Sequence, residues 1–187
     1  MKAPRWAAML VLVGSGMLPG CGAKKGAEEP VGISRSEGGP VVFSYDSLDQ
    51  RAVSSEASKG KPTVVSFIAT WDMMSQAQAD FVSVMAKTDG DRVAYYLVAL
   101  DDRINRELVE TFARTLALAC PVAVGDSDTV AGRSGFGNVA VPTTVVLDAE
   151  GRVAWRKTGL AKSDELRQVL ASVERAASLH LTSKPAE

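Results

Sequence analysis

The chain has 187 residues and a formal net charge of −1. Hydrophobic residues make up 46% of it and charged residues 23%, which is typical of a globular protein long enough for one domain with its own core. The small net charge supplies no basic field for a phosphate backbone, so no nucleic-acid partner is expected.

The start of the chain predicts a signal peptide over residues 1–20. Lys2 and Arg5 make it positively charged, and the apolar run over residues 6–18 is too short to span a bilayer comfortably. The letters "LPGC", which end at Cys21, resemble the bacterial lipobox. This resemblance implies that Cys21 carries a lipid and becomes the first residue of the mature chain. The alternative is an ordinary cleaved signal that leaves Cys21 as a thiol.

Lipidation at Cys21 would anchor the protein to a membrane of the bacterial cell envelope, with its domain facing the periplasm. The sequence leaves the choice between inner and outer membrane open. Disulfides can persist in that compartment. The chain has two cysteines, so acylation of Cys21 would leave Cys120 without a partner within the chain.

Composition divides the rest of the chain. Residues 21–40 are rich in Gly, Glu, Lys and Ser and lack apolar periodicity, which predicts a flexible tether. Residues 41–178 are expected to form the folded domain, and residues 179–187 a tail.

Strand and helix patterns alternate within the expected domain. Helices are expected after Asp72, over 103–118, near Asp126 or Asp128, and from Ser163 as an N-cap to about Ala177. Strands are expected over 41–45, 62–69, 92–101, 121–124 and in a hairpin over 142–159. This order predicts an α/β fold in which helices flank a central mixed sheet, with an antiparallel hairpin near the C-terminus.

Two motifs carry a resemblance to a known family. They are "GKPTVVSFIATW" over residues 60–71 and "VAVPTTVVLDAEGRV" over residues 139–153, followed by Gly159. With these motifs the chain resembles the thioredoxin fold, and within it the TlpA/ResA-type thiol-disulfide oxidoreductases of the envelope. The resemblance covers roughly residues 43–177 and implies a thioredoxin-like domain. The alternative is another α/β domain with a chance Val-Pro-Thr-Thr run.

The chain departs from that family where its chemistry would lie. The family places Cys-x-x-Cys after the tryptophan, but here Asp72-Met-Met-Ser75 follows Trp71. A cysteine at a helix N-terminus becomes a nucleophilic thiolate, and the second cysteine resolves the mixed disulfide. A carboxylate and a hydroxyl can do neither. Asp72 and Ser75 therefore match the lost cysteines, and we expect no catalytic residue here.

Other roles remain for this segment. Asp72 is expected to cap the helix, and the alternative is a fixed carboxylate in a peptide groove. Met73 and Met74 suit packing or surface contacts. Thioethers also bind Cu(I), but copper-handling relatives use two cysteines and a histidine, and the one histidine here is His180. We therefore expect no metal and no cofactor.

The resemblance also implies a peptide groove. Pro142 matches the family's cis-proline, and the backbone just before it pairs with a bound extended peptide in the family. Val141 and Pro142, together with Trp71, would then form the groove. The alternative is that Pro142 only shapes the entry to the strand.

Two functions follow from these features. The first is a non-catalytic module of the cell envelope that binds another envelope protein or an extended peptide segment. The second is a thiol-disulfide oxidoreductase, or a thiol-dependent antioxidant enzyme of the TlpA/redoxin type, that uses Cys120. We expect Cys120 to be buried and inert because it follows a helix C-terminus, where the dipole disfavours a thiolate. The alternatives are a reactive thiol and an intermolecular pairing.

Overall fold

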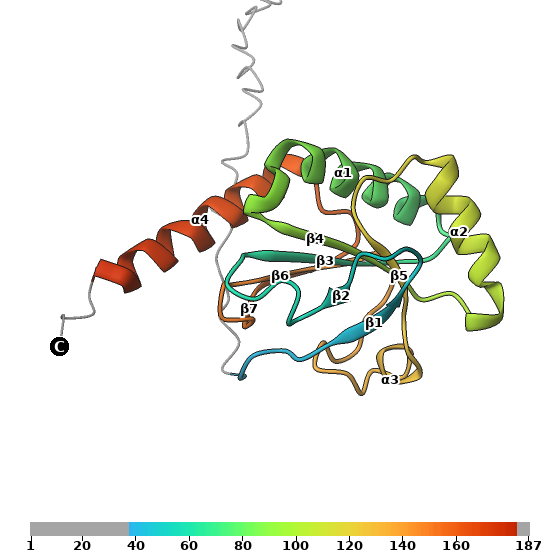
Figure 1. The fold of residues 1–187 in the computed structure, drawn as a ribbon, viewed down its shortest axis with the longest axis horizontal. Coiled ribbons are helices and arrows are strands. Elements are labelled where there is room, and N and C mark those ends of the chain that lie inside the picture. Colours follow the sequence, from blue (N-terminus) through green and yellow to red (C-terminus); the bar gives the residue numbers. More distant parts are fainter. Residues whose placement is uncertain (1–37, 183–187) are drawn as a thin grey trace, which may run out of the picture. The chain divides into compact units, whose positions relative to one another are not determined.

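The structure is a computed structural model that describes residues 38–182, and the side chains of residues 38–179 (Figure 1). Contacts divide the chain after Pro30, and residues Val31–Glu187 form a compact unit. The predicted signal peptide, the lipid site at Cys21, most of the predicted tether and the end of the predicted tail lie outside the described residues.

Seven strands form one sheet in the order β2-β1-β5-β4-β3-β6-β7. The central strands β5, β4 and β3 are parallel, and the outer pairs are antiparallel. The strands are β1 (Ser44–Ser47), β2 (Val53–Ser54), β3 (Thr63–Ile68), β4 (Ala94–Ala99), β5 (Val122–Val124), β6 (Thr143–Leu147) and β7 (Val153–Thr158). The expected mixed sheet with a C-terminal antiparallel hairpin is therefore confirmed.

Helices cover the sheet unevenly (Figure 1). The helices are α1 (Met73–Asp89), α2 (Arg106–Thr115), α3 (Ser127–Val130) and α4 (Ser163–Thr182), with 3-10 turns at Gly90–Arg92 and Arg103–Asn105. One core contains residues of α1, α2 and α4, such as Val82, Val109 and Leu166. The core on the other face contains Phe43 and Phe136, which lie outside the strands and helices.

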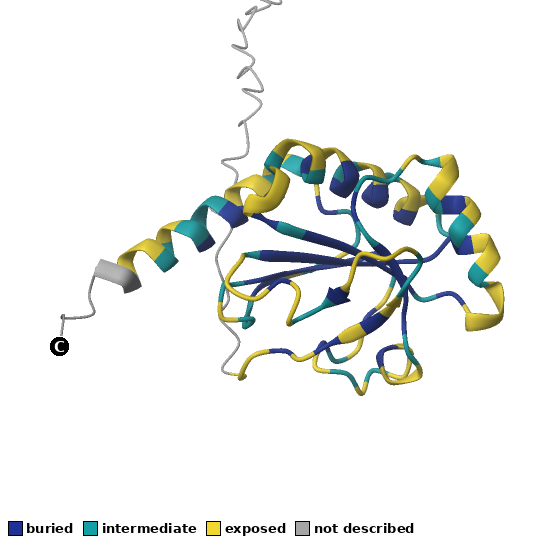
Figure 2. Cartoon of the chain, viewed as in Figure 1, coloured by how far each residue is buried: buried dark blue, intermediate teal, exposed yellow. Residues whose placement is uncertain are grey.

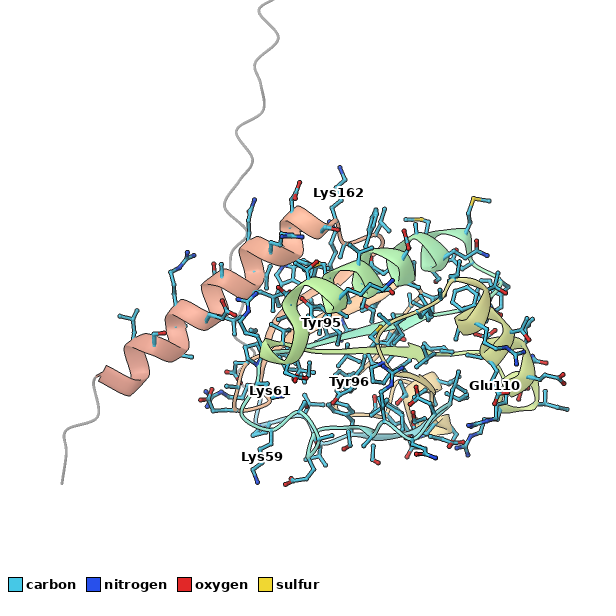
Figure 3. All side chains as sticks on the ribbon, turned by 45° about the horizontal axis from the view of Figure 1, so that its top comes forward. Lys59, Lys61, Tyr95, Tyr96, Glu110 and Lys162 are labelled. Carbon is cyan, nitrogen blue, oxygen red and sulfur yellow. The ribbon has the colours of Figure 1, made fainter. Side chains whose placement is uncertain are left out.

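The composition of β3 explains its position in the centre of the sheet. All six residues of β3 are buried, and most are apolar or β-branched, which suits a strand covered on both faces. In β4, successive side chains point to opposite faces. Tyr95 joins the core that includes α1, and Tyr96 joins the opposite core (Figure 3).

Several elements differ from those expected, including the end of α2 at Thr115 rather than at residue 118. β1 begins at Ser44 rather than residue 41, because the N–H of Val41 bonds to the Gly151 carbonyl oxygen instead of a strand ladder. β2 has two residues, too few to show a period. The 3-10 turn replaces the first part of the helix expected from residue 103, because Asp102 caps the N–H of Ile104.

Helix α4 differs at both ends. Ser163 is its first residue rather than its N-cap, because the Lys162 carbonyl oxygen already accepts the N–H of Leu166 at 3.0 Å. The helix runs to Thr182, beyond the end expected near Ala177. Within residues 38–182, no helix is long and apolar enough to cross a membrane.

Candidate functional site

Three chain segments meet at one end of the sheet, where β3 leads into α1 (Figure 1). Phe67 near the end of β3 pairs with Thr143 at the start of β6. The N–H of Leu100, just after β4, donates to the Ile68 carbonyl oxygen at 2.8 Å. The segments that follow β3 and β4 and the segment that precedes β6 therefore lie together.

Asp72 and Ser75 form the helix start. The Asp72 carboxylate accepts the Ser75 N–H at 2.8 Å and the Ser75 hydroxyl at 2.7 Å. The same Ser75 oxygen accepts the N–H of Ala69 at 3.1 Å, and Ser75 is fully buried. The expected N-cap at Asp72 is confirmed. Both side chains are engaged in holding the turn between β3 and α1.

Asp101 supports the same turn, and it belongs to none of the motifs noted in the sequence. Its buried carboxylate accepts the N–H of Thr70 at 3.0 Å and the Thr70 hydroxyl at 2.5 Å. The only available signal was an aspartate at the end of a predicted buried strand. This pair fixes the residue just before Trp71.

The residues between these anchors are apolar and exposed. Trp71 exposes 74% of its surface, Met73 82% and Met74 48%. The first turn of α1 accordingly carries exposed residues (Figure 2). Because apolar surface in water is unfavourable, a cluster of this kind is typical of an interaction site.

A hollow lies between the start of α1 and α2. It has a volume of about 290 Å³, and Thr70, Gln76, Leu108 and Phe112 contribute to its lining. Leu108 and Ile104, one turn before it, are both exposed. We call the exposed side chains of Trp71, Met73, Met74, Ile104 and Leu108 the apolar end surface.

The segment before β6 has the geometry expected from the resemblance. The Val141–Pro142 peptide bond is cis. Pro142 is buried and its carbonyl oxygen accepts the N–H of Gly159 at 2.7 Å, whereas Val141 is half-buried. Among the described residues, no backbone hydrogen bond engages Val141. Its N–H and carbonyl groups therefore remain available at this end of the sheet.

Gln78 lies one turn beyond Ser75 and is fully buried. Its side-chain oxygen accepts the N–H of Ala161 at 2.7 Å, while its side-chain nitrogen has no partner among the described residues. No pattern in the sequence predicted this bond. The contact joins α1 to the chain just before α4.

Cys120 lies away from the apolar end surface, in the loop before β5. It exposes 2% of its surface, and burial raises the pKa of its thiol from 9.0 to about 12. The expected burial is confirmed. The principal cause of the shift is desolvation, not the end of α2, which lies at Thr115.

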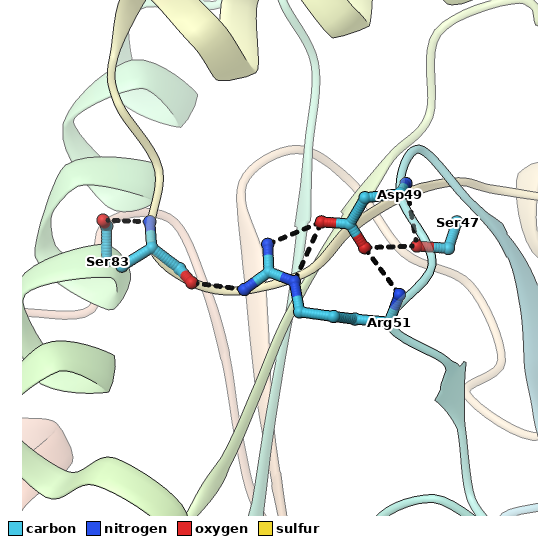
Figure 4. A network of polar contacts seen from close by, with 5 residues as sticks. Ser47, Asp49, Arg51 and Ser83 are labelled. Carbon is cyan, nitrogen blue, oxygen red and sulfur yellow. Dashed lines mark hydrogen bonds and ion pairs between the residues drawn. The ribbon is translucent and has the colours of Figure 1, made fainter.

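A polar network holds the residue just before this cysteine (Figure 4). Arg51 donates to the Ala119 carbonyl oxygen at 2.6 Å and to the Asp49 carboxylate at 2.8 Å. The Ser83 hydroxyl of α1 accepts the Ala119 N–H at 2.9 Å. These bonds fasten the residue before Cys120 to both α1 and the β1–β2 connection.

Two cavities share Arg51 and Cys120 in their lining. One, of about 400 Å³, is bordered by α2 residues such as Glu110. The other, of about 380 Å³, is bordered by Lys61, Tyr95 and Tyr96 (Figure 3). Among residues 38–179, no cluster of His, Cys, Asp or Glu could hold a metal ion.

Comparison with known proteins identifies the architecture. No family model matches the chain. The thioredoxin-like protein YneN of Bacillus subtilis (strain 168) is 26% identical over 145 residues, which cover 77% of this chain and 83% of the relative. A thiol:disulfide interchange protein of the thioredoxin family from Chlorobium tepidum TLS superposes with a TM-score of 0.63, at 21% identity, over 75% of this chain and 99% of the other. The protein has the thioredoxin-like fold.

Further solved structures agree with this assignment. A DsbF homologue from Corynebacterium diphtheriae has a TM-score of 0.66 at 20% identity and covers 85% of this chain and 99% of its own. A secreted thiol-disulfide isomerase from Corynebacterium glutamicum has a TM-score of 0.61 at 19% identity, covering 71% and 84%. The structural neighbours of this thioredoxin-like chain thus include thiol-disulfide proteins. In this chain Asp72 caps α1, and neither the cap nor the helix (Met73–Asp89) contains a cysteine.

Proposed function

We propose that this thioredoxin-like chain binds an extended segment of another cell-envelope protein and does not catalyse thiol–disulfide exchange. The observation that carries the proposal is the contrast within the first turn of α1. Asp72 and Ser75 are engaged in internal hydrogen bonds, while Trp71, Met73 and Met74 face solvent. The turn presents a binding surface and no group that could exchange disulfides.

The backbone beside that surface supports an extended ligand. Val141 lies at the same end of the sheet as the turn after β3, and no described residue pairs with its backbone. An extended peptide can add to such an unpaired segment through main-chain hydrogen bonds. Side chains of the peptide would then contact Trp71 and the neighbouring methionines.

The chemistry of sulfur argues against exchange at either candidate position. The first turn of α1 contains no cysteine. The Asp72 carboxylate cannot attack a disulfide, and the Ser75 hydroxyl cannot resolve a mixed disulfide. Cys120 is buried, and its raised pKa keeps the thiol protonated near neutral pH. The alternative enzyme that uses Cys120 would need a loop movement to form a thiolate.

The location belongs to the same proposal. The signal-like start and the "LPGC" sequence support anchoring through a lipid on Cys21, with the domain in the periplasm. A free-standing domain on a tether could reach segments of neighbouring envelope proteins. The proposal defines the bound protein by its chemistry, which is an apolar segment in an extended conformation.

Disulfide reductase turnover tests the absence of catalysis. Residues 31–187 would be assayed on insulin, beside a variant with Asp72→Cys and Ser75→Cys. We expect no turnover by the native unit and measurable turnover by the variant, because the scaffold would then carry the dithiol at the start of α1. Turnover by the native unit would make Cys120 the catalytic candidate and overturn the proposal.

Binding is tested with reduced, carboxymethylated lactalbumin, an unfolded chain without disulfides. Trp71→Ala should weaken its binding by at least about tenfold, since exposed tryptophans often dominate an interface. Val84→Ala is the matched control, because Val84 is also an exposed apolar residue of α1 but lies outside the first turn. Fluorescence anisotropy of the labelled probe gives both affinities. Equal losses in the two variants would contradict the assignment of the surface.

A further inference from the structure

The described part of the chain contains four sulfur atoms, and they differ sharply in accessibility. Met73 exposes 82% of its surface and Met74 48%, while Met85 exposes 1% and Cys120 2%. All four lie within the same domain, so the oxidants in the surrounding solvent are the same for all of them. Accessibility therefore separates them into two reactive and two protected atoms.

Oxidation of sulfur requires access and an available lone pair. A thioether reacts without first losing a proton, whereas a thiol reacts as its thiolate. Burial keeps the Cys120 thiol protonated near neutral pH. Cys120 therefore does not compete with the exposed methionines for a peroxide, which is the reverse of the usual order for cysteine and methionine.

We propose that Met73 and Met74 form an oxidation site and that their conversion to sulfoxides weakens binding at the apolar end surface. This regulation rests on the binding function proposed above. A hydroperoxide supplies the oxygen: the thioether sulfur attacks one peroxide oxygen, the O–O bond breaks, and a sulfoxide and water (or an alcohol) form. Sulfur loses two electrons and the peroxide gains them.

The consequence follows from position. Met73 and Met74 begin α1 next to the Asp72 cap that follows Trp71, so each sulfoxide places a strongly polar oxygen among exposed apolar side chains. A docked apolar segment would have to desolvate that oxygen without a designed partner, which disfavours the complex. The fold itself is spared, because neither exposed methionine belongs to a buried core.

The experiment treats the full chain, in mild detergent, with hydrogen peroxide and follows each methionine by peptide mass spectrometry. Met73 should be oxidised at least about tenfold faster than Met85, because oxidation follows exposure. Met85 is thus the internal control within the same helix. Similar rates for Met73 and Met85 in the folded chain would overturn the oxidation site.

The binding arm uses labelled, reduced and carboxymethylated lactalbumin. Peroxide treatment should lower the affinity of the native chain by at least about fivefold, in line with the loss of apolar contacts at an interface. The Met73→Leu, Met74→Leu double variant, compared with its own untreated sample, should keep its affinity. Met85→Leu is the matched control and should remain as sensitive as the native chain.

The outcomes separate the two proposals. If the untreated native chain does not bind the probe, the binding function fails, and the regulatory consequence fails with it, while the peptide-level rates still decide the oxidation site. If the untreated chain binds and its affinity survives complete oxidation of Met73 and Met74, the regulation is wrong and the binding function stands. An equal loss of affinity in the double-leucine variant would also overturn the regulation.

Discussion

At the scale of single residues, the start of α1 is held by side chains that would otherwise be candidates for chemistry. Ser75 donates to Asp72 and accepts from Ala69, so its hydroxyl joins the end of β3 to the first turn of the helix. Asp72 satisfies an N–H group that has no partner within the helix. These bonds fix the direction in which Trp71 leaves the sheet.

Ser75→Ala should destabilise the domain. The change leaves the buried N–H of Ala69 without its acceptor, which costs about 1–3 kcal/mol in the free energy of unfolding. Urea unfolding of residues 31–187 measures the change. Asp72→Asn is the matched control and should have a small effect, because asparagine caps a helix about as well as aspartate. An unchanged midpoint for Ser75→Ala would show that the hydroxyl bridge is dispensable.

Cys120 predicts a pH dependence of stability. Its pKa is raised from 9.0 to about 12 by burial, so folding favours the protonated thiol. This contribution is fully present below about pH 9 and is lost as the pH rises toward 12. The free energy of unfolding should therefore fall over this range. Tyr45, whose pKa burial also raises to about 12, acts in the same direction.

Two variants separate these contributions. Cys120→Ala should show a shallower fall of stability between neutral pH and the alkaline range, because the unfolded state no longer gains a thiolate. Tyr45→Phe should likewise remove the part of the alkaline fall in stability that Tyr45 contributes. Urea unfolding at several pH values gives the slopes. A slope unchanged in Cys120→Ala would mean that the thiol is solvated in the folded protein.

At the scale of elements, the Arg51 network joins three parts of the fold that are distant in sequence. It connects Asp49 after β1, the loop before β5 and, through Ser83, the middle of α1 (Figure 4). Arg51 itself is about half exposed, so its ion pair with Asp49 contributes little energy. Its more specific effect is to hold Ala119, and its side chain lines both cavities beside Cys120.

Arg51→Ala should therefore expose the thiol. Removal of the side chain releases the Ala119 carbonyl and takes away part of the lining of both cavities, so iodoacetamide should alkylate Cys120 several-fold faster in mildly alkaline buffer. Cys120 is the only cysteine after residue 30, so the rate in the 31–187 unit belongs to it alone. Arg133→Ala, which breaks an exposed ion pair with Asp128, is the control. Equal rates in both variants would contradict this role of Arg51.

At the scale of the whole molecule, the proposed anchor and the folded domain lie in different parts of the chain. The candidate lipid site precedes Pro30, and the apolar end surface belongs to the unit of Val31–Glu187. Binding and membrane attachment should therefore be separable by mutation.

Cys21→Ser should release the protein from the membrane fraction of a bacterial host without changing the affinity of the domain for lactalbumin. The reason is that a thioether-linked lipid, and not the folded domain, would supply the membrane affinity. Cell fractionation followed by immunoblotting measures the distribution. Cys120→Ser is the control and should remain with the membrane. Persistence of Cys21→Ser in the membrane fraction would argue against lipidation.

The fold was largely predictable from the sequence because its signals are local. The β-branched run of β3 and the glycine turn between β6 and β7 each specify an element within a few residues. The cap at Asp72 is equally local. The two-residue β2 and the exact start of α4 were not predicted. They depend on hydrogen bonds that the pattern of a short sequence segment does not reveal.

The absence of a dithiol at the start of α1 follows from the amino acids alone, because the identity of residues 72–75 excludes exchange chemistry in any conformation. Which of these side chains are accessible depends on tertiary packing. Ser75 is buried and bonds to Ala69, Met73 faces solvent, and Asp101 reaches Thr70 from the segment after β4. Such contacts depend on how distant segments pack, and burial, not residue type, sets which atoms can bind or react.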